Sequence, residues 1–137
     1  MGWGVRRGVL FGLGFALLGA GHVLAQVDLA ARVKKAQDAA RANAASPEGR
    51  EWLKGHSPAA GRLMIPVLNR CLPDPPGDIP TVFEVYVRLT RAGRAREIVT
   101  ELDAALGKCM TTAARDMPFP EAPRDDYWIQ VNMAAPL

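Results

Sequence analysis

The most constraining feature of the 137-residue sequence is an alternating segment in its second half. Across residues 82–90, apolar residues occupy every second position, namely Phe83, Val85, Val87 and Leu89. A period of two predicts a β-strand with one buried face. Gly93 lies in a short polar turn after this strand, and residues 95–100 return as a second strand. The segment is therefore expected to form an antiparallel hairpin.

The residues after the hairpin predict a helix and then one more strand. Thr100 or Asp103 can cap the helix, and the Pro-rich residues 118–123 end it. Its apolar stripe, expected to point inward, consists of Leu102, Leu106, Cys109, Met110, Ala113 and Met117. Residues 127–133 alternate again, which predicts a strand that buries Tyr127 and its alternate neighbours. The order of these elements indicates an α+β fold in which N-terminal helices precede a β-β-α-β unit.

The N-terminal half is predicted to be helical in two parts. Residues 26–45 are Ala-rich, and their helical stripe offers little to bury, so we expect a helical and partly detached spacer. Serine followed by proline signals a helix start, and it occurs at Ser46 and again at Ser57. The second start opens a helix that ends at Cys71 and that Pro66 is expected to kink or divide. Four prolines in residues 72–80 then predict a stiff extended connector.

Residues 1–25 have the three parts of a secretory signal peptide. Arg6 and Arg7 precede an uncharged apolar run over residues 9–25, which ends in Val23-Leu24-Ala25 with small residues at the cleavage positions. Cleavage before Gln26 predicts a periplasmic protein. The alternative is an uncleaved membrane anchor with both arginines on the cytoplasmic side.

Removal of this signal changes the charge balance. The formal net charge of +3 falls to about +1 because Arg6 and Arg7 are lost, so the sequence provides no electrostatic case for nucleic-acid binding. The predicted organisation is a signal peptide over residues 1–25, a helical spacer over 26–56 and an α+β domain over 57–137.

Cys71 and Cys109 are the two cysteines of the chain. Two cysteines in a small exported protein most simply form one structural disulfide. A redox pair or a metal site is the alternative. Neither is favoured, since the cysteines are far apart in sequence and only His56 would remain to help hold a metal in the mature chain. No cofactor is expected.

No residue pattern indicates an enzyme. His56 lies beside Ser57, but no second histidine accompanies it in the mature chain, and Ser57 lacks the flanking glycines of a nucleophile elbow. Asp125 and Asp126 are paired carboxylates, and a solvated pair that stabilises a turn is favoured over an acid–base or metal site. Trp128, with Tyr86 and Trp52, is expected outside the alternating core faces. Trp128 either anchors a partner or covers the second face of the sheet, and covering is favoured.

The stretch from Phe83 to Met133 resembles the C-terminal domain of TonB-type energy transducers, and especially small periplasmic proteins with a helix cysteine before a Phe-Pro-rich break. The resemblance rests jointly on Ala92-Gly93-Arg94, Cys109 and Phe119-Pro120 with Pro123. It implies a small three-stranded antiparallel sheet with a helix packed on one face. It also implies that the last strand lies at an edge and accepts an extended segment of a partner.

The predicted function is therefore a non-enzymatic periplasmic binding module that recognises an envelope protein through this edge strand. Its contact residues are predicted to be Trp128, Gln130 and Asn132. One alternative is a structural or stress-related envelope protein whose Ala-rich segment docks to a partner or to itself. Another is an anchored, transducer-like protein, if the signal is not cleaved. The sequence leaves the oligomeric state open.

Overall fold

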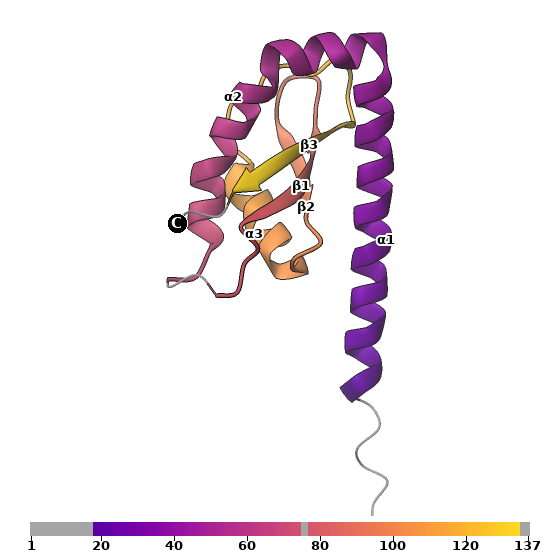
Figure 1. The fold of residues 1–137 in the computed structure, drawn as a ribbon, viewed down its shortest axis with the longest axis vertical. Coiled ribbons are helices and arrows are strands. Elements are labelled where there is room, and N and C mark those ends of the chain that lie inside the picture. The colour runs from indigo at the N-terminus through magenta and orange to yellow at the C-terminus, as the bar shows by residue number, and fades with distance from the viewer. Residues whose placement is uncertain (1–17, 75–76, 135–137) are drawn as a thin grey trace, which may run out of the picture.

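The computed structural model describes residues 18–74 and 77–134, which form three helices and one sheet (Figure 1). In chain order the elements are α1 (Leu18–Ala45), α2 (Pro47–Cys71), β1 (Val82–Leu89), β2 (Ala95–Val99), α3 (Ala104–Ala114) and β3 (Tyr127–Ala134). The sheet is antiparallel with strand order β2-β1-β3. The predicted α+β fold, with N-terminal helices before a β-β-α-β unit, is confirmed.

One face of the sheet carries the main hydrophobic core. The predicted inward residues of β1 and β3, such as Val85 and Ile129, are buried there together with Met64 of α2 and Met110 of α3. Both predicted alternations are thus confirmed. Gly93, at φ +80°, makes the predicted turn between β1 and β2, because this backbone conformation favours glycine.

Helix α2 begins as predicted and then runs further than predicted. The Ser46 hydroxyl accepts a hydrogen bond from the Gly49 amide at 3.0 Å and so caps the helix. The predicted second start at Ser57 is wrong, and of the kink or division predicted at Pro66 the division is excluded, because α2 is continuous. The helix changes direction along its length (Figure 1). Burial of its apolar face against the sheet offsets the hydrogen bonds that its internal prolines cannot donate.

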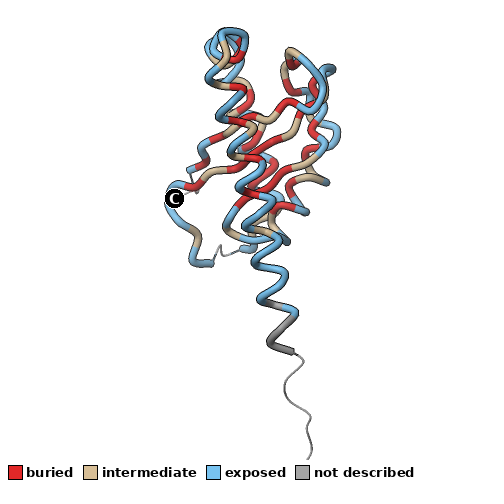
Figure 2. The backbone as a smooth tube through the Cα atoms, turned by 90° about the vertical axis from the view of Figure 1, so that its right-hand side faces the viewer, coloured by how far each residue is buried: buried red, intermediate tan, exposed pale blue. Residues whose placement is uncertain are grey.

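Helix α1 covers the second face of the sheet, and the prediction of a partly detached spacer is therefore wrong. Val33, Ala36 and Ala40 are buried in a second cluster with Tyr86 of β1 and Val99 of β2. Small alanine side chains let the helix approach the sheet closely, and Tyr86 supplies the bulk that the alanines lack. Figure 2, in which α1 faces the viewer, shows the buried segments of the strands behind it.

The N-terminal turns of α1 extend past the sheet (Figure 1). Val23, Leu24 and Val27 are exposed in this part, which contains the predicted cleavage site. Residues 1–17 of the predicted signal peptide lie outside the described residues. Among residues 18–74 and 77–134, no helix combines the length and the apolarity that a membrane span requires.

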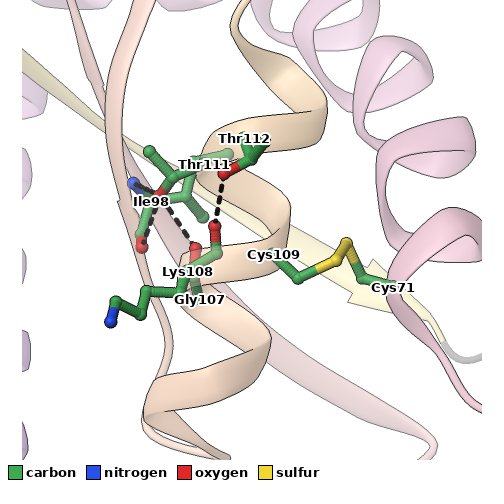
Figure 3. The surroundings of a disulfide bond; sticks show 7 residues. All are labelled: Cys71, Ile98, Gly107, Lys108, Cys109, Thr111 and Thr112. Atoms are coloured by element: carbon green, nitrogen blue, oxygen red, sulfur yellow. Dashed lines mark hydrogen bonds between the residues drawn. A yellow bond between two sulfur atoms is a disulfide. The ribbon is translucent and has the colours of Figure 1, made fainter.

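The predicted disulfide between Cys71 and Cys109 is present and joins the end of α2 to α3 (Figure 3). The two Cα atoms are 5.7 Å apart. Cys109 is exposed, however, so its predicted inward orientation is wrong. The positions of α3 that face the core are those of Gly107, Met110 and Ala114, and Cys109 lies on the side that faces α2.

Candidate functional site

The sheet has two edge strands, and α3 closes the edge formed by β2. The Ile98 amide donates to the Thr111 hydroxyl at 2.9 Å, and this hydroxyl lies 3.3 Å from the Ile98 carbonyl oxygen (Figure 3). Gly107 lets α3 come this close, since a Cβ there would lie 3.0 Å from the same carbonyl oxygen. The Thr111 hydroxyl donates to the Gly107 carbonyl at 2.8 Å, so the Ile98 amide is the strand group that it engages, and this contact hinders pairing of the edge with another strand.

The outward backbone groups of β3 belong to Trp128, Gln130 and Asn132. The Trp128 carbonyl accepts a hydrogen bond at 2.9 Å from the Asn43 side chain of α1, so it points away from β1. Alternate residues of an antiparallel strand share this direction. The strand register supports this direction for Asn132, which lies opposite Glu84 of β1. The Glu84 carbonyl points toward β2, where it accepts a hydrogen bond from the Thr100 hydroxyl, so the backbone groups of Asn132 point away from β1.

A groove of about 480 Å³ follows this edge between α1 and α2. Tyr127 to Gln130 of β3 line one part of it, and Leu53 of α2 adds an apolar wall. Arg41 of α1 and Lys54 of α2 are exposed and give the groove two positive charges on opposite sides. The groove therefore offers unpaired strand backbone, apolar surface and cationic groups to an extended anionic segment.

Asn43 closes the end of the groove at the corner between α1 and α2. Its side chain is buried, donates to Trp128 and accepts from the Arg124 guanidinium. The Asn43 carbonyl accepts from the Ser46 hydroxyl at 2.7 Å. Gly49 makes this corner possible, because a Cβ at that position would lie 1.7 Å from the Asn43 carbonyl oxygen. The corner fixes α1 relative to β3.

The predicted contact side chains are largely engaged within the protein. Trp128 is partly buried against the cluster beneath α1, and its ring lies 5.9 Å from the Arg88 guanidinium carbon, so the covering interpretation is confirmed. The Gln130 amide donates to Glu84 at 3.0 Å and to Asn132 at 3.1 Å. Asn132 alone of the three predicted residues is exposed. Exposed recognition groups on β3 are therefore mainly backbone atoms.

Trp52 differs from its prediction, because it lies in the main core rather than outside it. Its indole N–H donates to the Glu121 carbonyl at 2.6 Å, and its ring packs edge-on against Tyr127 at 5.6 Å. It thus supports the first residue of β3 from the α2 side.

A partly buried polar network lies beneath α1. The Tyr86 hydroxyl donates to Glu84 at 2.5 Å and accepts from Gln37 of α1 at 3.1 Å. Burial, with the hydrogen bond and negative charge of Glu84, raises the pKa of Tyr86 from 10.0 to about 12, although Gln37 and Arg41 act in the opposite direction.

This pKa predicts a loss of stability in strong alkali. The folded pKa of Tyr86 exceeds the unfolded value, so its contribution is fully present below pH 10 and is lost as the pH rises towards about 12. Ultraviolet absorbance of the phenolate should show that Tyr86 titrates later in the folded protein than in denaturant. A Glu84→Gln variant should titrate earlier than the parent protein. Coincident titration of folded and denatured protein would contradict this assignment.

The remaining titratable candidates do not converge on a reaction centre. Asp125 accepts from the Arg91 amide at 2.8 Å, whereas Asp126 pairs with Arg88 at 3.2 Å. His56 is exposed and its ring lies 5.3 Å from that of Trp52. Within the described ranges, no three His, Cys, Asp or Glu side chains gather as a metal site.

Comparisons with family models, curated proteins and solved structures find no match to this chain. The resemblance to TonB C-terminal domains therefore stays a prediction. Sequence reasoning identified β3 but missed Asn43, Arg41 and Lys54. These residues come to the strand only because α1 packs on the sheet and because α2 turns back at the Gly49 corner. Residue spacing contains no signal for that arrangement.

Proposed function

We propose that this chain is an exported, non-enzymatic binding module that takes up an extended, acidic segment of an envelope protein along the free edge of β3. Export rests on the predicted signal peptide, and the envelope location of the partner follows from it. The observation that carries the proposal is the contrast between the two edges. Thr111 engages Ile98 at the β2 edge, whereas the β3 edge borders a groove with cationic groups on both sides.

The chemistry of the groove defines the partner. A strand added beside β3 would meet the outward N–H and C=O groups of Gln130 and Asn132 and would gain affinity from backbone hydrogen bonds. Carboxylates on that strand would lie near Arg41 and Lys54. Asn43 already occupies the Trp128 carbonyl, so pairing would begin at Gln130 and proceed toward the end of β3.

The packing of α1 disfavours the alternative in which this helix docks to a partner. The apolar stripe of α1 at Val33, Ala36 and Ala40 is already buried on the sheet. A partner that used this stripe would first have to separate α1 from Tyr86 and Val99.

A proline substitution tests edge pairing directly. Linear peptides would be selected from a randomised phage-displayed library against protein purified from cells that express the full chain. We expect acidic peptides with alternating apolar residues. Asn132→Pro should weaken their binding about tenfold or more, because proline removes an outward N–H while the β1–β3 hydrogen bonds remain. Binding would be measured by calorimetry.

Asn132→Ala is the matched control, since it removes the side chain and keeps the N–H, and it should bind nearly as the parent protein does. Lys54→Glu should weaken binding of an acidic peptide without any change to the strand. This variant therefore still tests the groove if the proline variant unfolds. If no peptide is selected, or if the selected peptides bind the proline and alanine variants equally, edge pairing is wrong.

A further inference from the structure

A second hollow, of about 630 Å³, lies where the β1–β2 hairpin meets the end of α3. Three arginines line it: Arg94 from the turn, Arg96 from β2 and Arg115 from the end of α3. All three are exposed, and none forms an ion pair with a carboxylate in the described part of the chain. Like charges repel, so three unneutralised guanidinium groups around one hollow favour an anion.

The surrounding contacts hold the hollow in shape without neutralising it. The Arg94 guanidinium donates to the Asp116 carbonyl at 3.3 Å, which holds the turn against the end of α3 beside Arg115. The Arg94 amide donates to the Thr90 hydroxyl at 3.1 Å. Asp125 is the one acidic residue that lines the hollow, and its carboxylate accepts from the Arg91 amide at 2.8 Å. The charge balance around the hollow stays positive.

Two other arginines, Arg88 of β1 and Arg32 of α1, show the opposite arrangement. Arg88 lies between Glu97, at 3.4 Å, and Asp126, at 3.2 Å, and Arg32 also pairs with Glu97. Arg88 and Arg32 are thus neutralised within the chain. The hollow on the α3 side instead brings together, around one concave surface, three arginines that form no ion pair among the described residues, and this convergence favours an external anion.

We propose that this hollow is a binding site for a phosphate group, held by Arg96 and Arg115 with Arg94 at its rim. Guanidinium groups bind phosphate oxygens in pairs of parallel hydrogen bonds, and arginines from separate elements can contact different oxygens of one tetrahedral group. The phosphate can belong to a small solute or to a lipid headgroup. The proposal does not depend on the peptide groove, which other residues form.

Calorimetric titration with inorganic phosphate and with glycerol 3-phosphate, at constant ionic strength, tests the site on protein purified from cells that express the full chain. We expect saturable binding, with amide shifts in nuclear magnetic resonance spectra confined to residues near 90–96 and 111–116. A combined Arg96→Gln and Arg115→Gln variant should weaken binding about tenfold or more. Arg62→Gln, an exposed arginine of α2 that does not line the hollow, is the matched control and should bind as the parent does.

A second arm identifies the source of the phosphate. The same proteins would be sedimented with phosphatidylcholine vesicles that contain or lack phosphatidic acid. Binding of the soluble phosphates alone assigns a solute, whereas arginine-dependent binding of the phosphatidic acid vesicles assigns a headgroup. If neither probe binds, or if Arg62→Gln weakens binding as much as the double variant does, the proposed site is wrong.

Discussion

Reduction of the Cys71–Cys109 disulfide is expected to cost about 4 kcal/mol of unfolding free energy, the largest effect predicted for any single bond of this protein. The bond joins residues 38 positions apart, and its loss releases a loop that includes the Pro-rich connector and the hairpin. In the chain-entropy model, most of the lost stability comes from the greater conformational entropy of the unfolded chain once the bond is broken. Because Cys109 is exposed, a thiol reductant should reach the bond without prior unfolding. Urea denaturation followed by circular dichroism, with and without dithiothreitol, measures the effect.

The Cys71→Ser, Cys109→Ser double variant provides the control for reduction. It should show the same low stability as the reduced parent, and dithiothreitol should leave it unchanged. An unchanged denaturation midpoint in fully reduced parent protein would contradict the structural role of the bond.

Substitution of Gly49 by alanine is expected to destabilise the protein by about 3 kcal/mol or more, because the new Cβ collides with backbone rather than with a movable side chain. That Cβ would lie 1.7 Å from the Asn43 carbonyl oxygen, so the corner between α1 and α2 would have to open. Opening moves Asn43 away from Trp128 and exposes the cluster beneath α1. Thermal and urea denaturation measure the loss, and the tryptophan fluorescence of a Trp52→Phe background follows the environment of Trp128.

Gly55→Ala is the matched control within the same helix. A Cβ there meets no atom within 4 Å, so alanine should stabilise α2 slightly, by about 0.5–1 kcal/mol. If the two substitutions have similar effects, the account of a closely packed corner is wrong.

The strands could be predicted from sequence because their signals are local. The period-two pattern of Phe83 to Leu89, the turn at Gly93 and the pattern from Tyr127 are each readable within a few residues. The position of α1 could not be predicted in this way. Val33, Ala36 and Ala40 form too thin a stripe to predict burial, and the Tyr86 side chain that completes their packing lies about 50 residues later in the chain.

The candidate site lies along the predicted strand, but the groups that this strand offers to a partner differ from the predicted side chains. Alternation correctly assigned Trp128, Gln130 and Asn132 to the face opposite the main core. It could not show that α1 partly covers Trp128 or that Glu84 accepts from Gln130. Along most of the β3 edge, the groups available to a partner are backbone atoms. Nearly every residue type has these atoms, so residue identity cannot predict them. Whether that edge binds a partner stays a prediction.

Amide hydrogen exchange at the two edges tests the edge-binding proposal most directly. In the free protein, the amides of Gln130 and Asn132 should exchange rapidly, whereas the Ile98 amide, bonded to Thr111, should exchange slowly. Addition of a selected acidic peptide should slow exchange at Gln130 and Asn132 about tenfold or more and leave Ile98 unchanged. A peptide that binds without protecting these two amides would contradict pairing along β3.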